Sequence, residues 1–268
     1  DAPLDRDLIA RAAPALDDGR PVHLTAAVTN RDRAVGTLLG WTAGRRCPTG
    51  LPDDTVRIDL CGSAGQSLGA FLPVGITVTV TGDANDYVAK GLSGGRVVVR
   101  PDPAAPFDPH EQIVAGNTVL YGATSGELFL HGRVGERFAV RNSGADAVCE
   151  GTGDHACEYM TGGRVVILGA TGRNLGAGMS GGLAYVLDLE PGRVNTASVH
   201  LQPVDDDLAP LHDLIARHHV RTGSAVAGEI LAEWPGSAVR FTAVVPEDLI
   251  RVRAAAGERP TPVGADGA

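Results

Sequence analysis

Five acidic or imidazole side chains are candidates for carbohydrate or metal chemistry: Asp83, Asp86, Asp154, His155 and Glu158. Carboxylates gathered on one face of a protein can act as general acid and base on a sugar, or can hold a metal ion. Asp also stabilises turns, because its side chain accepts hydrogen bonds from nearby backbone N–H groups. Since Asp83 and Asp154 stand where loops are expected, we favour the turn-stabilising interpretation.

A glycine-rich stretch from Gly172 to Gly182 contains spacings like those of the dinucleotide-binding fingerprint, whose glycines bring backbone N–H groups onto a pyrophosphate. That fingerprint lies between a strand and a helix, whereas strand-like repeats flank this stretch on both sides. Cys149, His155 and Cys157 are three possible zinc ligands at an unfamiliar spacing, and the chain has no CxxC pair. We therefore expect glycine turns and reduced cysteines, with no catalytic, cofactor-binding or metal site in this chain.

The composition and charge of the 268 residues disfavour several other classes of protein. A net charge of −9 without a run of Lys or Arg lacks the basic surface that binds nucleic acid or anionic membranes. No apolar stretch approaches the roughly 18 residues of a membrane span, and the first residues lack the layout of a secretory signal. We therefore expect a cytoplasmic protein. Because the chain starts with Asp1 rather than Met, we also expect it to be processed or cut from a longer polypeptide.

A repeat of about 19 residues organises the middle of the chain. The anchors of this repeat are separated by 19, 31, 18, 19 and 19 residues. The long interval contains residues 101–112, which include four prolines and therefore predict a loop insertion. Without that loop the interval is again 19 residues. The anchors are Ile76, Gly95, Gly126, Gly144, Gly163 and Gly182.

A short strand follows each anchor, and its second and fourth residues are mostly aliphatic. Because these aliphatic positions recur about every 19 residues, the same face of each strand is apolar. This pattern predicts a solenoid of parallel strands, with rungs about 4.8 Å apart. Asp146 interrupts the aliphatic pattern, which we attribute to a local register shift in the 18-residue repeat. The second-position column is Val78, Val97, Leu128, Asp146, Val165 and Ala184, and the fourth-position column is Val80, Val99, Leu130, Val148, Ile167 and Val186. Positive-φ corners between strands are expected at Gly95, Gly126, Gly144, Gly163 and Gly182.

The segment before the repeat predicts a helix and lead-in strands. Residues 4–17 have a helical pattern that Pro14 should split, because proline cannot continue the backbone hydrogen bonding of a helix. Residues 21–29 and 55–61 alternate between apolar and polar side chains, as strands do.

The segment after the repeat predicts two helices. Asp207 is the expected N-cap of a helix that reaches Gly223, and Ser224 is the expected N-cap of the next helix. His218 and His219 lie near the end of the first helix, where we expect them at the surface. The expected organisation is a lead-in of helix and strand at 1–54, the β-helix at 55–200, helices and a final strand at 201–253, and a disordered tail at 254–268.

Seven glycine-rich strings are long and unusual enough to identify a family. They are GSAGQS at 62–67, GDANDYV at 82–88, KGLSGGR at 90–96, GNTVLYGATSG at 116–126, GERFAVRNSG at 135–144, GDHACEYMTGG at 153–163 and GRNLGAGMSGG at 172–182. With these strings the chain closely resembles the C-terminal, GXGXG-motif domain of the large (alpha) subunit of glutamate synthase. The resemblance extends from about residue 4 to about residue 245 and includes the terminal helices.

This resemblance implies a right-handed parallel β-helix with flanking helices, within an enzyme that makes two glutamates from glutamine and 2-oxoglutarate. Electrons would come from NADPH, NADH or ferredoxin. The resemblance places FMN and a 3Fe-4S cluster elsewhere in the large subunit, and FAD and 4Fe-4S clusters in a small partner subunit. The family's amidotransferase domain begins with a nucleophilic cysteine, whereas residue 1 here is Asp1. None of the family's catalytic or cofactor residues matches a position of this chain.

The resemblance also implies a structural role in ammonia assimilation. The β-helix would be a rigid spacer against which the amidotransferase and synthase domains of the same polypeptide pack. The small subunit would be a further partner, while nucleic acid and membranes would not be. Among the residues at outer corners, Arg141, Asp154 and Arg173 are expected to contact the neighbouring domains.

Two other classes of protein share a coil of this kind. A stand-alone scaffold protein, like the β-helical subunit of formylmethanofuran dehydrogenase, would have the glycines but no need for the flanking helices. A carbohydrate-active β-helix enzyme would need export and an exposed carboxylate groove. The match across both flanks disfavours the first class, and the missing secretory signal disfavours the second.

Overall fold

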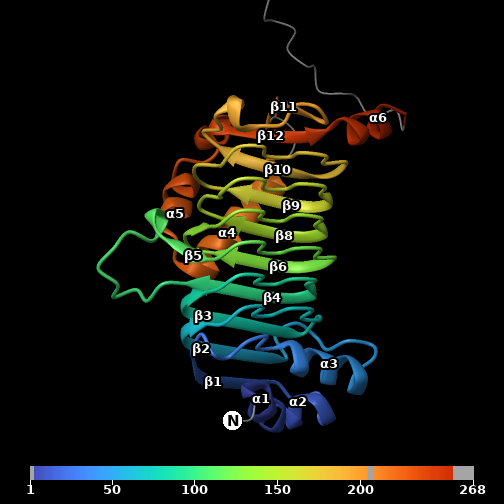
Figure 1. Ribbon diagram of the computed structural model, residues 1–268, viewed down its shortest axis with the longest axis vertical. Coiled ribbons are helices and arrows are strands. Elements are labelled where there is room, and N and C mark those ends of the chain that lie inside the picture. The colour runs from blue at the N-terminus through green and yellow to red at the C-terminus, as the bar shows by residue number, and fades with distance from the viewer. Residues whose placement is uncertain (1–2, 205–207, 256–268) are drawn as a thin grey trace, which may run out of the picture.

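Parallel strands stacked in rungs form the body of the protein in the computed structural model, which describes residues 3–204 and 208–255 (Figure 1). The stacked strands are β1 (Val22–Val28), β2 (Val56–Ala64), β3 (Ile76–Ala84), β4 (Ser93–Arg100), β6 (Ser125–Leu130), β8 (Ser143–Cys149), β9 (Thr161–Ile167) and β10 (Gly181–Leu187). Each pairs in parallel with the next, which gives a solenoid of about seven turns. The predicted solenoid of parallel strands is therefore confirmed.

Aliphatic side chains stack in columns inside the coil. Every member of the two inward-facing columns is at most 1% exposed, so each rung buries its apolar face only against its neighbours. Burial of one such side chain contributes about 1.5–3 kcal/mol. The columns are Val78, Val97, Leu128, Ala147, Val165 and Ala184, and Val80, Val99, Leu130, Cys149, Ile167 and Val186.

The register shift predicted at Asp146 is present. Asp146 lies opposite Glu127 on one side and Arg164 on the other, so Ala147 takes the inward position. The ladder between β8 and β9 is irregular between Ser143 and Asp146. The buried Asn142 supports this irregularity, because its side-chain oxygen accepts the backbone N–H of the two residues that precede Asp146.

The chain returns from one strand to the next through segments of alternating backbone conformation. In each of six such segments in the described chain, the first, third and fifth residues have positive φ. They lie at 67–71, 87–91, 118–122, 137–141, 155–159 and 174–178, with φ between 53° and 73°. Most of these positive-φ residues are not glycine, and sequence reasoning did not predict the pattern.

Hydrogen bonds between rungs hold the return segments in this conformation. Arg137 and Arg141 donate their backbone N–H to carbonyls of the next rung, at 2.8 and 2.9 Å. Ala139, between them, donates to Val119 of the previous rung at 2.9 Å. Positive φ costs a residue other than glycine about 1–2 kcal/mol, so each of these bonds offsets a local strain.

Three of the glycine anchors have the backbone conformation expected of them. Gly126, Gly163 and Gly182 have φ of +102°, +82° and +78°, which residues with a Cβ adopt only with strain. They lie within the first three residues of β6, β9 and β10 rather than between strands.

Gly95 and Gly144 require a different explanation, because positive φ is not their conformation. A Cβ at Gly144 would lie 2.3 Å from the carbonyl oxygen of Thr124, and one at Gly95 would lie 2.8 Å from that of Pro73. The expected positive-φ corner is therefore wrong at both positions. Glycine is needed there because the backbone of the previous rung comes too close for a side chain.

Helices cover the N-terminal end of the stack. The helix predicted over residues 4–17 is split at Ala12, giving α1 (Leu4–Arg11) and α2 (Ala13–Asp18), with Pro14 in the first turn of α2. Leu8 and Leu16 bury their side chains in the core. A further helix, α3 (Thr37–Arg46), packs against α1 and was not predicted from the sequence.

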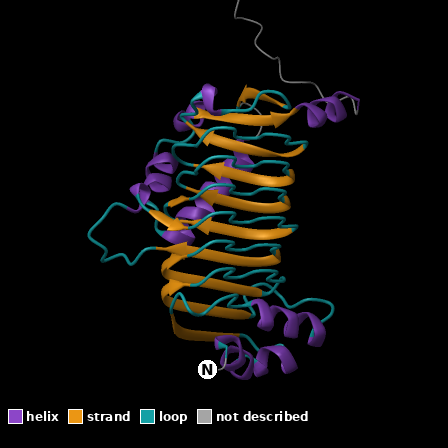
Figure 2. Ribbon diagram, viewed as in Figure 1, coloured by secondary structure: helices purple, strands orange, loops and turns teal. Residues whose placement is uncertain are grey.

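Antiparallel strands and three helices complete the C-terminal side (Figure 2). Strand β12 (Phe241–Pro246) pairs with β10, and β11 (Val199–Pro203) pairs with β12. Helix α4 (Leu208–Thr222) lies against the outer face of β4, β6, β8 and β9. Ser224 caps α5 (Ala225–Ala232) as predicted, since its side chain accepts the N–H of Ala227. The predicted cap Asp207 lies outside the described residues.

Residues 101–112 leave the stack as a projecting loop, as predicted from their prolines (Figure 1). The short strands β5 (Ile113–Ala115) and β7 (Arg133–Val134) pair beside the end of this loop. Helix α6 (Glu247–Ala255) includes the first two residues of the predicted tail, and the remainder of that tail lies outside the described residues. Single 3₁₀ turns are η1 (Pro109–Glu111), η2 (Pro191–Arg193) and η3 (Gly236–Arg240).

Substitution of a glycine inside the stack tests whether close backbone approach limits the fold. We expect Gly144→Ala to lower the free energy of unfolding by about 2 kcal/mol or more, because its Cβ would lie 2.3 Å from Thr124 O. The matched control is Gly192→Ala in η2, where no atom lies within 4 Å of the new Cβ and the effect should be within about 1 kcal/mol. Equal urea midpoints for the two variants would contradict this account.

Candidate functional site

A row of charged side chains crosses the outer face of four neighbouring rungs. Arg96, Glu127, Asp146 and Arg164 lie directly opposite one another in the parallel ladder. Arg96 donates to Glu127 at 2.5 Å, and Arg164 donates to Asp146 at 2.5 and 3.0 Å. The two carboxylates are adjacent, so the row alone would place like charges side by side.

Helix α4 supplies the cation that separates these two carboxylates. Arg217 forms ion pairs with Glu127 and with Asp146, the second at 3.8 Å. Four residues further along α4, Arg221 lies 3.8 Å from Asp54, which also pairs with Arg96 at 3.0 Å. The ion pairs therefore join α4 to the stack beside the apolar contact that the helix makes with it.

A buried carboxylate lies at the other edge of α4. The side chain of Glu150, just after β8, is 0% exposed and accepts a hydrogen bond from Ser224 at 2.5 Å. Three imidazoles surround it: His218 at 3.4 Å, His131 at 3.9 Å and His110 at 4.0 Å. This Glu150 cluster connects the stack, the projecting loop, α4 and the N-cap of α5. His218 was expected at the surface, but it is fully buried because α4 turns this side toward the strands.

The pKa values of Glu150 and His218 are both lowered, but for different physical reasons. Burial opposes ionisation of Glu150, but hydrogen bonds from His218 and Ser224 hold its pKa below the ordinary value. Burial lowers the pKa of His218 in spite of the adjacent carboxylate. Glu150 is therefore ionised and His218 neutral near pH 7.

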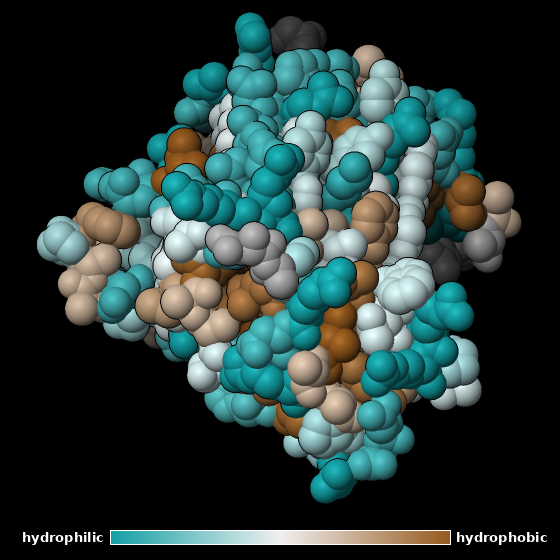
Figure 3. Space-filling model, turned by 60° about the horizontal axis from the view of Figure 1, so that its bottom comes forward, coloured by the Kyte–Doolittle hydropathy of each residue, from teal (hydrophilic) through white to brown (hydrophobic). Residues whose placement is uncertain are grey.

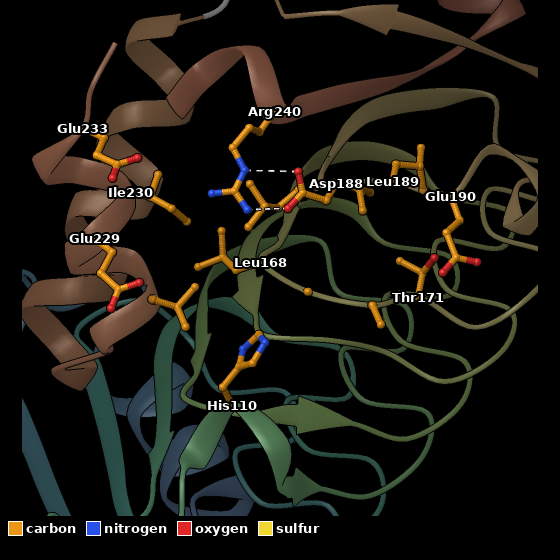
Figure 4. A pocket seen from close by; sticks show the side chains of 15 residues that line it. His110, Leu168, Thr171, Asp188, Leu189, Glu190, Glu229, Ile230, Glu233 and Arg240 are labelled. Atoms are coloured by element: carbon orange, nitrogen blue, oxygen red, sulfur yellow. Dashed lines mark hydrogen bonds and ion pairs between the residues drawn. The ribbon is translucent and has the colours of Figure 1, made fainter. Parts of the chain in front are cut away.

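A cavity of about 400 Å³ opens beside this cluster, between the end of β10 and α5 (Figure 4). Its walls include the apolar Leu168 and Ile230, and the ion pair of Arg240 with Asp188 crosses one side at 3.1 Å. His110 reaches it from the projecting loop, and its Nδ1 is buried without a hydrogen-bond partner among the described residues. The glutamates at the rim are exposed, so the cavity by itself identifies no ligand.

Two of the carboxylates considered as catalytic groups for a sugar substrate accept hydrogen bonds from the backbone of turns instead. Asp86 accepts the backbone N–H of Asn117 at 2.8 Å, and Asp154 accepts that of Arg173 at 2.9 Å. The return segments that follow these two carboxylates are three rungs apart, or about 14 Å at 4.8 Å per rung. Asp83 is exposed, so the structure does not gather these groups into one catalytic face.

The expected contact residues lie on the return-segment side of the coil. Asp154 and Arg173 form an ion pair at 2.8 Å, and this pair holds the pKa of Asp154 below its ordinary value, the backbone hydrogen bond from Arg173 contributing most. Arg141 is exposed on a neighbouring rung. His155 and Glu158 lie 3.8 Å apart between them. This side of the coil therefore presents paired charges to the outside.

The four cysteines differ in burial, with Cys61 exposed and Cys47 partly buried. Cys149 and Cys157 are buried, and burial raises the pKa of both thiols, that of Cys157 to about 12. In the absence of a bound metal, both thiols are therefore protonated near pH 7. Within residues 3–204 and 208–255, no group of three or more His, Cys, Asp or Glu has the arrangement of a metal site. In the same ranges, no helix combines the length and apolarity needed to cross a bilayer.

Comparison with known proteins gives a consistent result. A family model described as the GXGXG motif matches residues 5–247. The chain is 51% identical over 251 residues to the NADH glutamate synthase of Schizosaccharomyces pombe, covering 91% of this chain and 12% of that protein. It is 41% identical over 252 residues to the large chain of the NADPH glutamate synthase of Bacillus subtilis, with coverage of 91% and 17%. It is 44% identical over 250 residues to ferredoxin-dependent glutamate synthase 2 of Synechocystis, with coverage of 91% and 16%. The chain thus spans less than a fifth of these relatives, in their C-terminal region.

Removing Arg217 tests the charge row. We expect Arg217→Gln to lower the free energy of unfolding by about 1–2 kcal/mol, because Glu127 and Asp146 then repel each other beneath α4. The control Asp213→Asn removes only an exposed partner of Arg217 and should change stability by less than about 0.5 kcal/mol. Adding Glu127→Gln to Arg217→Gln should restore part of the loss. A double variant no more stable than Arg217→Gln would contradict the repulsion.

The Glu150 cluster should make stability depend on pH. Below about pH 6.5 an unfolded histidine takes up a proton, whereas folded His218 does not, so stability falls with acidification. The lowered pKa of Glu150 adds a second loss at more acidic pH, once the unfolded carboxyl is protonated. We expect His218→Gln, which keeps a donor toward Glu150, to be less stable at pH 7.5. When the pH falls from 7.5 to 5, the free energy of unfolding should decrease in both proteins. The decrease should be smaller in His218→Gln, by up to about 2 kcal/mol. Urea unfolding at both pH values measures this, and an unchanged loss in the variant would disprove it.

Proposed function

Because the chain belongs to the family defined by the GXGXG motif, we propose that it is a structural domain of a glutamate synthase large chain. In this proposal the β-helix is a rigid spacer that holds the amidotransferase and synthase parts of the polypeptide at a fixed distance. The whole enzyme would make two glutamates from glutamine and 2-oxoglutarate, in the cytoplasm.

The observation that carries the spacer role is the closed hydrogen bonding of the stack. Strands and return segments both pair with the rungs above and below, so the coil has two bonded ladders along its length. Deforming the rod would break bonds in both ladders, because native cores transmit strain rather than absorb it. A rod of this kind fixes the separation of whatever docks on it.

The names of the relatives support a role that does not depend on the electron donor. Relatives named for NADH, NADPH and ferredoxin match the chain at 51%, 41% and 44% identity. A segment that bound the donor would be expected to diverge most between these classes. The similar matches therefore favour a function that all three kinds of enzyme need.

The proposal assigns cofactors and catalytic groups to other parts of the enzyme. FMN and a 3Fe-4S cluster would belong to the rest of the large chain, and FAD and 4Fe-4S clusters to a small subunit. Among the described residues, no group of three or more His, Cys, Asp or Glu is arranged to hold a metal ion, so no step of the reaction is derived through the cysteines of this chain. Arg141, Asp154 and Arg173, together with the helices, would contact the neighbouring domains.

The size of the native polypeptide tests the assignment. We expect an immunoblot of the source cells to give a band several times larger than 27.6 kDa, since the relatives are at least about five times longer than the matched segment. A native chain of 27.6 kDa would contradict the proposal and favour a separate scaffold subunit.

A second measurement tests the spacer role inside the large chain. Glutamate formation is compared with glutamine and with added ammonia as nitrogen donor, in the unsubstituted enzyme and in Gly144→Ala. A loosened rod should lower the glutamine-dependent rate several-fold more than the ammonia-dependent rate, because only the first needs the two domains in place. Gly192→Ala is the control. Equal loss of both rates would count against a spacer.

A further inference from the structure

An apolar groove lies at the N-terminal end of the rod, between α1 and α3. It has a volume of about 930 Å³, and its walls include Leu4, Val35, Leu38 and Trp41. Figure 3 turns this end forward and shows apolar residues gathered on it between hydrophilic ones. We call it the Trp41 groove and define it by Pro3, Leu4, Arg31, Arg33, Leu38 and Trp41.

The Trp41 groove is held open by a buried carboxylate. Asp5 of α1 is 3% exposed and accepts the backbone N–H of Gly36, Leu38 and Leu39 at 2.7, 2.7 and 3.1 Å. These N–H groups begin α3 and have no partner within the helix, so Asp5 caps α3 from a different helix. The two walls are therefore fixed to each other, and a ligand would bind without first having to order them.

The outer face of α3 presents large apolar side chains to water. Trp41 is 60% exposed and Leu38 is 38% exposed, while Leu39 and Ala43 on the opposite face are buried in the core. The guanidinium of Arg45 lies over the ring of Trp41, 5.2 Å from its centroid, and the residue still remains 60% exposed. A tryptophan and a leucine beside a preformed hollow are the composition of a protein-binding site, not of a solvated helix face.

The groove is lined by two arginines and two aspartates, but only the arginines are exposed at its rim. Arg31 and Arg33 are exposed, whereas Asp5 is buried beneath the first turn of α3. The nearby Asp32 is engaged within its own turn, where it accepts from the backbone and hydroxyl of Thr29 at 2.8 and 2.9 Å. A basic rim around an apolar hollow complements apolar side chains flanked by carboxylates.

We propose that the Trp41 groove is the docking site for an apolar segment flanked by carboxylates, which belongs to the part of the large chain outside residues 1–268. This inference rests on the proposed function. Pro3, the first described residue, lines the groove, so any chain that runs into residue 1 approaches the groove directly. The relatives contain far more polypeptide than this segment, which supplies the occupant. The groove thus fixes one end of the rod to its neighbour.

Hydrogen exchange in the intact large chain tests the docking. Trp41→Glu places a charge in the groove without filling the core, because the side chain is mostly exposed. We expect exchange of the α3 amides to rise about tenfold in this variant, since a docked segment no longer covers them. The control Val239→Glu changes an apolar side chain that is 86% exposed at the opposite end, in η3, and should leave α3 unchanged. Unchanged exchange in β8 and β9 verifies that the rod remains folded.

The outcomes separate the docking from the proposed function. If the native polypeptide is long but α3 exchanges alike in the unsubstituted enzyme and in both variants, the docking is overturned while the proposed function stands. If the native polypeptide is only 27.6 kDa, the proposed function and the docking fail together. If the 268-residue chain sediments as a dimer that Trp41→Glu makes monomeric, the occupant is a second copy and the proposal is overturned. Loss of α3 protection in Trp41→Glu alone supports it.

Discussion

The pairing of every rung with the rungs above and below is the constraint on which this structure depends. On the strand side the pairing is an ordinary parallel ladder. On the return side it requires positive φ at alternate residues, among them Tyr87, Leu120 and Cys157, which would not adopt it in isolation. The backbone N–H of each of these three residues donates to a carbonyl on a neighbouring rung, which offsets the strain. No rung can therefore hold its conformation alone, and the stack folds as a unit.

The same constraint explains where the repeat can vary. Residues 101–112 leave the coil as a loop, and β6 afterwards continues the parallel ladder beside β4. The 18-residue repeat is accommodated by an irregular start of β8, with Asn142 bonding the backbone that the ladder leaves unpaired. Both changes leave the inward columns continuous, from Val97 through Leu128 to Ala147. A repeat can therefore gain or lose residues only where the change leaves the apolar columns continuous.

Period and polarity made much of this fold predictable from the sequence. The 19-residue spacing, the parallel strands, the break at Pro14 and the shift at Asp146 all follow from local patterns that can be counted along the chain. The return segments were not predictable, because their geometry comes from neighbouring rungs and not from their own residues. Glu150 and Ser224, 74 residues apart in the sequence, meet only because α4 lies back across the strands. The capping role of Asp5 was not predictable either. A helix cap supplied by another helix lies at no fixed distance in the sequence from the helix that it caps.

The molecule has two apolar outer faces, one on the strands beneath α4 and α5 and one on α3. The two ends of the rod differ because only the first face is covered by the described chain. Toward the C-terminal end, the outward residues Phe129, Val148 and Tyr185 would be exposed, but α4 and α5 cover them and the Glu150 cluster and Arg217 fix these helices in place. At the N-terminal end, the outer face of α3 has a comparable need for cover, yet no element of the described chain lies over Trp41. The chain covers the first face with the 15 residues of α4, and the uncovered, already ordered face of α3 therefore supports the docking proposed for the Trp41 groove. The described chain thus covers the apolar face of its strands with its own helices and leaves the outer face of α3 uncovered, and the proposed docking would remove this difference.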